Sequence, residues 1–170
     1  MINNQIHNSL LFIENYGPLI VIFFSILELY KKKFYLIFFI FGSILNTIIN
    51  LFLKYIIRQP RPKIYKIDYA NQLGYIYSID KYGMPSGHAQ NLGFSLGFMY
   101  FFIKDSYLSY FFIVITFLTL YQRFMNNKHS IIQLILGLII GLIFGIITFS
   151  LANHYIKGNL NIKKDDNAIF

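Results

Sequence analysis

The sequence predicts an all-α integral membrane protein, a bundle of about five transmembrane helices with a polar site at one membrane face. Three observations favour this fold class. Hydrophobic residues make up 56% of the 170 positions and charged residues only 13%, whereas soluble domains carry about 25% charged residues. Five apolar stretches each approach the roughly 20 residues that cross a bilayer. Polar residues gather in short clusters between these stretches.

The first apolar stretch, from about Leu10 to Tyr30, contains Glu14 and Glu28 close to its ends. It has neither a basic start nor a small-residue cleavage site. We therefore expect a retained span and not a removed signal peptide.

The second stretch, Phe34 to Leu53, follows three lysines. Its Asn46 and Asn50 lie one helical turn apart, and we expect both to face other helices. Amides inside an apolar span are costly to expose to lipid, so they indicate an interior face of the bundle.

The last three stretches run from about Gly87 to Ile103, Tyr107 to Phe124 and Ser130 to Tyr155. The final one carries Gly137, Gly141 and Gly145 at four-residue spacing. Such a stripe lets two helices approach closely, and we expect it to pack inside the bundle in preference to a homodimer seam. The oligomeric state is left open.

We expect a single domain over residues 1–170, with the motifs inside about 46–145 and a polar tail over 158–170. Cysteine is absent, which excludes disulfides and thiolate metal sites. The net charge of +8 is carried in short clusters between apolar runs. That pattern favours anionic lipid surfaces or phosphate groups over a nucleic-acid partner.

Five spans would place three polar segments on one side of the membrane: the beginning of the chain, Lys54 to Met84, and the turn Arg123 to His129. Nearly every unusual polar residue falls in these segments. The sequence therefore predicts a site at that face. Which side of the membrane it faces is left open, because lysines and arginines are divided almost evenly between the two faces.

The segment KYIIRQPRP, Lys54 to Pro62, is the first polar cluster. Lys54 and Arg58 are four residues apart and would share a helix face if the second span continues. Pro60 and Pro62 stop the helix and turn the chain, which carries Arg61 back towards the same region. The alternative is a set of cations that only mark the membrane interface.

The second cluster is PSGH, Pro85 to His88. Ser86 is a good N-cap, and Gly87 allows a ligand to approach the backbone closely. The N-terminus of the third helix would then point at an anion, with His88 placed to donate a proton to it. The alternative is a capped transmembrane helix with an interfacial histidine.

The third cluster is QRFMNNKHSIIQ, residues 122–133. Arg123 ends the fourth span and His129 opens the fifth. Gln133 lies one turn further on the same helix face, where its oxygen can accept a hydrogen bond from one imidazole nitrogen and fix the tautomer. The alternative is an interfacial turn without a catalytic role.

Together the clusters bring three cations, two histidines and one helix N-terminus to one membrane face. A tetrahedral, multiply charged oxyanion such as phosphate fits these surroundings. The long loop carries only Asp68 and Asp80 as acidic residues. Two-metal phosphoryl transfer needs several carboxylates, so we expect no metal and no other cofactor. In a metal-free mechanism one histidine attacks phosphorus and the other protonates the departing oxygen.

With these motifs the chain resembles the type 2 phosphatidic acid phosphatases, which are membrane relatives of the vanadium haloperoxidases. That family has K-x6-R-P, P-S-G-H and S-R-x5-H-x3-D, in this order. The first two motifs are complete here, and the third keeps its arginine and its histidine. The resemblance extends over roughly residues 46–145.

The resemblance implies a role for each matched residue. His129 matches the nucleophile, which forms a phosphohistidine intermediate, and His88 matches the general acid. The implied activity is metal-independent hydrolysis of lipid phosphates or diphosphates. The implied phosphate-binding positions are Lys54, Arg61, Ser86, Gly87 and Arg123.

The third motif departs from the family at two positions, with Gln122 in place of serine and Gln133 in place of aspartate. A neutral amide can orient His129, but it does not stabilise an imidazolium as an anion does. One alternative is a weakened or catalytically silent relative that binds lipid phosphate. The other is a subgroup that works with glutamine. The dolichyl diphosphatases resemble this chain in H-x3-Q, in KYGMPS and in the segment around Lys54 to Pro62.

This second likeness implies a polyprenyl or dolichyl diphosphate substrate and a location in the endoplasmic reticulum or another endomembrane. A phosphatidate-type phosphatase of broad specificity is the alternative among enzymes. A structural membrane protein with only interfacial polar turns is the alternative outside them. The expected partners are membrane lipid and a lipid phosphate, and the catalytic candidates are His129, His88 and Gln133.

Overall fold

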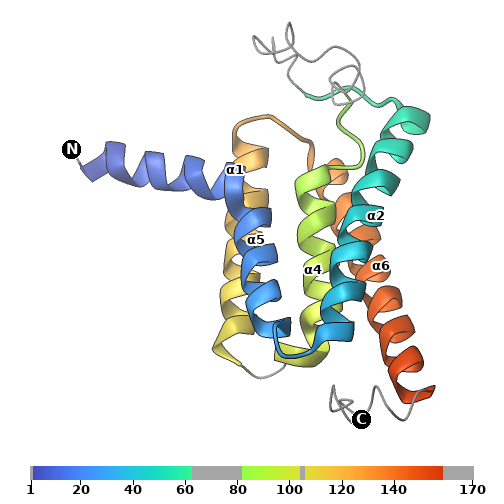
Figure 1. Ribbon diagram of the computed structural model, residues 1–170. Helices are drawn as coiled ribbons and strands as arrows, with labels where there is room; N and C mark the ends of the chain where they lie inside the picture. Colours follow the sequence, from blue (N-terminus) through green and yellow to red (C-terminus); the bar gives the residue numbers. More distant parts are fainter. Residues whose placement is uncertain (1, 63–81, 104–105, 159–170) are drawn as a thin grey trace, which may run out of the picture.

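The computed structural model describes residues 2–62, 82–103 and 106–158. These residues form helices and no strand, which confirms the predicted all-α bundle (Figure 1). The helices are α1 (Ile2–Leu29), α2 (Lys33–Ile57), α4 (Gly87–Ile103), α5 (Tyr107–Met125) and α6 (Ile131–Gly158). Residues 63–81, which include Asp68 and Asp80, and the predicted tail beyond Gly158 lie outside the described residues.

The outer surface of the bundle is apolar. Phe41, Phe52 and Phe117 are 69%, 62% and 65% exposed on it. Helices α1, α2, α5 and α6 are each long and apolar enough to cross a membrane. Large apolar side chains at such exposure suit a hydrocarbon solvent and not water. The prediction of a multi-pass membrane protein is therefore confirmed.

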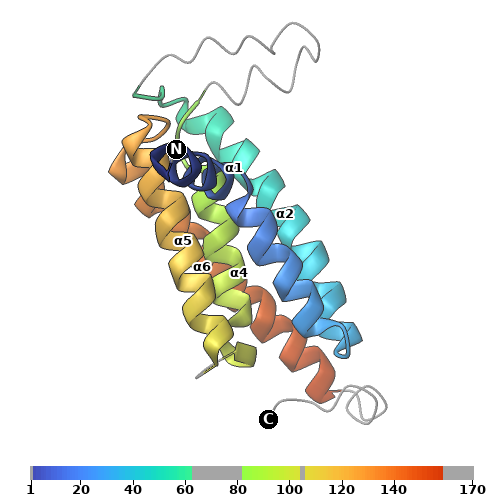
Figure 2. The same cartoon turned by 90° about the vertical axis from the view of Figure 1, so that its left-hand side faces the viewer.

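Helix α4 has only 17 residues and lies inside the bundle, packed closely against α6 (Figures 1 and 2). The glycine stripe of α6 faces it. A side chain at Gly141 would overlap the carbonyl oxygen of Gln90, and one at Gly145 would overlap that of Phe94. Because glycine has no Cβ, the two backbones can touch. The stripe packs inside the bundle, as predicted.

Helix α1 begins at Ile2, earlier than the predicted Leu10, and it contains Pro18. Its first turns extend sideways from the bundle, and its later turns run beside α5 (Figure 1). Proline lacks an N–H and its ring clashes with the carbonyl four residues earlier, which bends a helix. The bend places Glu14 and Asn15 at the end of the bundle where α4 begins.

A chain of buried amides links α2 and α4. Asn50 Nδ2 donates to Gln90 Oε1 at 2.8 Å, and Gln90 Nε2 donates to Asn46 Oδ1 at 2.9 Å. Asn46 Nδ2 donates in turn to Asn91 Oδ1 at 2.8 Å. The prediction that Asn46 and Asn50 face other helices is confirmed. These bonds fix the start of α4 against the last turns of α2.

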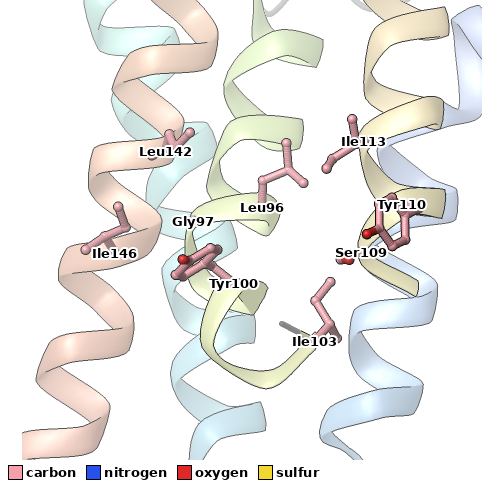
Figure 3. Close-up of a pocket in the computed structure, with 9 residues that line it drawn as sticks. All are labelled: Leu96, Gly97, Tyr100, Ile103, Ser109, Tyr110, Ile113, Leu142 and Ile146. Carbon is pink, nitrogen blue, oxygen red and sulfur yellow. The ribbon is translucent and has the colours of Figure 1, made fainter. Parts of the chain in front are cut away.

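The other half of α4 borders an apolar cavity of about 530 Å³ between α4, α5 and α6 (Figure 3). Leu96, Tyr100 and Ile113 are among the residues that line it. The residues that line it include no histidine, lysine, arginine or carboxylate. This cavity therefore suits a hydrocarbon chain and offers no acid, base or cation for chemistry.

Candidate active site

The three polar motifs meet at the end of the bundle where α4 begins (Figure 1). The start of α1, the end of α2 and the α5–α6 turn lie at this end, as predicted, and α6 ends at the opposite one. The predicted site residues occupy the following positions: Lys54 in the last turn of α2, Arg61 after it, Ser86 before α4, Gly87 and His88 in the first turn of α4, Arg123 in the last turn of α5, His129 in the α5–α6 turn, and Gln133 in the first turn of α6.

His129 is buried, and both of its ring nitrogens have partners. Nδ1 lies 3.0 Å from the carbonyl oxygen of Gly83 and 3.3 Å from Oε1 of Gln133. Both partners are acceptors, so Nδ1 carries the proton. Nε2 then holds a lone pair, which faces Nη2 of Arg123 at 3.3 Å. The predicted bond to Gln133 is present, and the Gly83 carbonyl is a second acceptor that the sequence did not indicate.

Burial lowers the pKa of His129 to about 3, and the positive charges of Arg123, Arg61 and Lys54 add to this effect. The hydrogen bond to Gln133 acts in the opposite direction. An imidazole with this pKa is neutral at physiological pH. Cations from the first and third motifs therefore act on one ring, and they keep its Nε2 lone pair available.

Gln133 connects His129 to the segment that follows α2. Its Nε2 donates to Oε1 of Gln59 and to the carbonyl oxygen of Pro60, each at 2.9 Å. Its Oε1 accepts from the backbone N–H of Ser130 at 3.2 Å as well as from His129. Acceptors at one end of the amide and donors at the other fix its orientation. A carboxylate could satisfy His129 but would meet the Pro60 oxygen with a second oxygen.

Sequence reasoning missed the contribution of Gln59. Its side chain binds Gln133, and its carbonyl oxygen accepts from the backbone N–H of Gly83 at 2.8 Å. Gln59 lies between the matched lysine and arginine of the first motif, at a position that the motif leaves unspecified. The co-occurrence of two glutamines at unspecified or altered motif positions is the signal that could have suggested the pair.

Arg58, in the segment Lys54 to Pro62, does not share a face with Lys54. Lys54 is 3% exposed, whereas Arg58 is exposed and lies outside the cluster. Helix α2 ends at Ile57, and Arg58 takes a left-handed conformation with φ of 52°. Its Nε donates to the carbonyl of Tyr55 at 2.9 Å, and its guanidinium lies 4.9 Å from that ring centre. The shared face requires that the helix continue, and α2 ends before Arg58.

Ser86 precedes α4, as predicted, but its hydroxyl does not cap the helix. Its backbone N–H donates to the carbonyl of Gln133 at 3.1 Å. Its Oγ is fully buried and has no hydrogen-bond partner among the described residues. A buried hydroxyl without a partner is unfavourable unless a ligand supplies one. Ser86 Oγ and the N-terminus of α4 therefore form a ready site for an anion.

His88 is half-buried in the first turn of α4. Its Nε2 lies 3.3 Å from the carbonyl oxygen of Asn15 on α1. A carbonyl only accepts, so Nε2 carries a proton, and Nδ1 is the nitrogen that can exchange a second one. Both histidines lie at the same end of the bundle, as predicted.

Glu14 is a further polar residue at this end, and the sequence placed it only near the edge of a span. It is fully buried. Lys128 forms an ion pair with its Oε1 at 2.8 Å, and Asn126 Nδ2 donates to its Oε2 at 2.6 Å. Both partners lie in the turn that leads to His129. The helical period of α1 gives no indication of this contact.

The family model described as the PAP2 superfamily matches residues 35–157. A dolichyldiphosphatase from Saccharomyces cerevisiae is 37% identical over 83 residues, which cover 42% of this chain and 33% of the yeast protein. The chain thus spans about a third of the length of that relative. No solved structure gives a significant match. Helix α1 precedes the residues that the family model matches.

Proposed function

Because this chain belongs to the PAP2 superfamily, we propose that it is a metal-independent phosphatase that hydrolyses a phosphate or diphosphate monoester of a membrane lipid. The reaction passes through a phosphohistidine on His129. One observation carries the proposal: a buried imidazole, neutral because its pKa is lowered to about 3, turns its unprotonated Nε2 towards a cluster of cations.

Binding comes first. Lys54, Arg61 and Arg123 hold the phosphate oxygens, and charge-assisted bonds of this kind are among the strongest hydrogen bonds in proteins. Ser86 Oγ supplies another donor, and the backbone N–H groups at Gly87 and beyond add the positive end of the α4 dipole. The same groups stabilise the charge that develops on the equatorial oxygens.

In the first chemical step, Nε2 of His129 forms a bond to phosphorus while the bond from phosphorus to the leaving oxygen breaks. His88 donates a proton to that oxygen, which departs as the lipid alcohol or the lipid monophosphate. The phosphorylated ring of His129 carries positive charge and keeps its Nδ1 proton. The Gly83 and Gln133 oxygens accept from that proton and stabilise the ring.

In the second step, water attacks phosphorus on the side opposite to His129. His88, now neutral, accepts a proton from this water, and the N–P bond breaks. Inorganic phosphate leaves, His129 returns to its neutral form, and His88 is protonated again for the next cycle.

The hydrogen bond between Gln133 and His129 favours an active enzyme over a catalytically silent relative. The amide makes the bond to His129 Nδ1 that the family aspartate would make, and the Gly83 carbonyl adds a second acceptor at 3.0 Å. Two neutral dipoles thus replace one anion. The site loses one negative charge, which suits a substrate that carries an additional phosphate.

We propose a polyprenyl diphosphate as substrate, with an endoplasmic reticulum or other endomembrane location. The likeness to a yeast protein named dolichyldiphosphatase supports this, as do H-x3-Q and the sequence KYGMPS. An apolar exterior gives a long isoprenoid chain access from the bilayer.

The test uses the purified full chain in detergent with EDTA. Polyprenyl diphosphate, polyprenyl monophosphate and phosphatidate are offered, and released phosphate is measured. We expect phosphate from the diphosphate, and a phosphoenzyme that is stable to alkali and labile to acid. A requirement for added magnesium would overturn the mechanism. Equal rates on phosphatidate would indicate the phosphatidate-type enzyme of broad specificity instead.

The same preparation distinguishes the non-catalytic alternatives. A silent relative would bind the lipid phosphates without releasing phosphate. A structural membrane protein would do neither, and single replacement of Lys54, His88 or His129 would then change nothing measurable.

A further inference from the structure

We infer that the Glu14–Lys128 ion pair sets the position of His88 relative to His129, so that helix α1 is part of the active site. The inference rests on the proposed function of the two histidines. Glu14 acts through other groups and is therefore a positioning residue. Neither the three motifs nor the matched region 35–157 includes it.

Glu14 forms its ion pair in a buried place. It is 0% exposed although it lies inside the candidate membrane span Asn8–Leu29. Its two oxygens are occupied by Lys128 at 2.8 Å and by Asn126 at 2.6 Å. A buried carboxylate is retained only where its partners are well placed. Both partners belong to the short turn that connects the end of α5 at Met125 to His129.

That turn sets the distance between Arg123 and His129. The carbonyl oxygen of Arg123 accepts from the backbone N–H groups of Lys128 at 3.0 Å and of His129 at 3.3 Å. Asn127 has a φ of 55°, in the left-handed region. The side-chain oxygens of Glu14 contact two residues of this turn, Asn126 and Lys128. A displaced turn would move His129 Nε2 away from Arg123.

The neighbouring residue on α1 reaches the second histidine. The carbonyl oxygen of Asn15 lies 3.3 Å from His88 Nε2. Lys128 Nζ also donates to Oδ1 of Asn15 at 3.5 Å. Lys128 therefore contacts two neighbouring residues of α1. Glu14 holds the turn next to His129, and Asn15 contacts His88.

Helix α1 is itself held against α5 close to Glu14. Thr119 Oγ1 of α5 donates to the carbonyl oxygen of Ile13 at 3.2 Å. At Gly17 the two helices approach so closely that a Cβ would overlap the Thr119 hydroxyl. The ion pair thus connects the two histidines through a rigid support, which is what positioning a nucleophile and an acid on one phosphate requires.

The alternative is that Glu14 only fastens α1 to the bundle. The two roles predict different losses of activity on different substrates when Glu14 is replaced. An alkyl phosphate needs a proton from His88 as it departs, whereas an aryl phosphate has a good leaving group and needs little. A misplaced acid therefore slows the alkyl substrate more. A general loss of active enzyme lowers both rates by the same factor.

The experiment compares Glu14→Gln with Glu28→Gln, a matched change of the exposed glutamate near the other end of α1. Turnover of a polyprenyl phosphate and of an aryl phosphate is measured per phosphorylatable site, and thermal melting is followed by circular dichroism. For Glu14→Gln we expect about a tenfold to hundredfold lower kcat on the alkyl substrate, a smaller loss on the aryl substrate and an unchanged KM. For Glu28→Gln we expect changes within about twofold on both.

Lys128→Met tests the same pair from its more exposed end and serves if Glu14→Gln does not fold. We expect the same unequal loss, and the double variant should lose no more than the worse single one. Equal losses on both substrates, multiplying losses in the double variant, or a Glu14→Gln enzyme like Glu28→Gln would overturn the inference. A wild-type chain inactive on every lipid phosphate would instead refute the proposed function.

Discussion

The two histidines at the end of the bundle differ in how their rings are held. His129 is 2% exposed and bound on both nitrogens, by Gly83 and Gln133 on one side and by Arg123 on the other. His88 is half-buried, and its Nε2 contacts the Asn15 carbonyl. A nucleophile needs one fixed tautomer and a dry lone pair, whereas an acid–base group must exchange protons with water. The different surroundings of the two rings therefore favour His129 as the nucleophile and His88 as the acid–base group.

Replacing the buried ring should have the largest effect. We expect His129→Ala to lower kcat by at least about 10⁴-fold, because the group that forms the covalent bond is lost. The measurement is phosphate release together with phosphoenzyme yield. His154→Ala, an exposed histidine near the far end of α6, is the control and should retain full activity. If His129→Ala still formed a phosphoenzyme, the nucleophile would be another residue, and the roles inferred for the two histidines would be wrong.

Replacing the half-buried ring should have the next largest effect. We expect His88→Ala to lower kcat by about 10²- to 10⁴-fold on an alkyl phosphate, and by less on an aryl phosphate. A phosphoenzyme should still form from the aryl substrate and should persist, because the base for the second step is missing. Alkaline-quench labelling measures it. Equal losses on both substrates would count against His88 as the acid.

Changing the group that holds the buried ring should have a smaller effect. Gln133→Asp restores the family residue, but the aspartate side chain is one methylene shorter and lacks the N–H groups that donate to Gln59 and to the Pro60 carbonyl, each at 2.9 Å. We expect about a tenfold loss of activity and a lower diphosphate-to-monophosphate preference. Gln122→Ser, the other departure from the family, is the matched control. A gain in activity, or an unchanged preference, would contradict this account of Gln133.

The smallest effect concerns pH. In the proposed mechanism the neutral form of His129 is the nucleophile, so its protonation should reduce kcat/KM only as the pH falls towards about 3. The positive charge of Arg123 helps to lower this pKa. Arg123→Gln removes that charge, so the pKa rises and the acid limb moves to higher pH. Profiles from pH 3 to 7 on one substrate measure the shift.

Arg58→Gln is the control for the pH profile, since Arg58 is exposed and lies outside the cluster. We expect an acid limb like that of the wild type. An unmoved limb in Arg123→Gln would show that another group sets it.

The membrane bundle, the approximate positions of its helices and the motif residues could all be predicted from the sequence. These follow from local rules, because a span is a continuous apolar run and Gln133 must lie one turn after His129 on any helix. The same rules could not show that α2 ends before Arg58, since the end of a helix depends on its capping contacts.

The distant groups that hold the two histidines could not be predicted in this way, because they come together only when the helices pack. Gln59, Gly83 and Glu14 lie 70, 46 and 115 positions from His129. Gly83 contacts His129 through its backbone oxygen, and Gln59 contacts Gln133 through its side-chain amide. Burial of Glu14 depends on the bend at Pro18 and on the close approach at Gly17. Periodicity fixes the face of each helix, but the contacts between faces depend on how all the helices pack together.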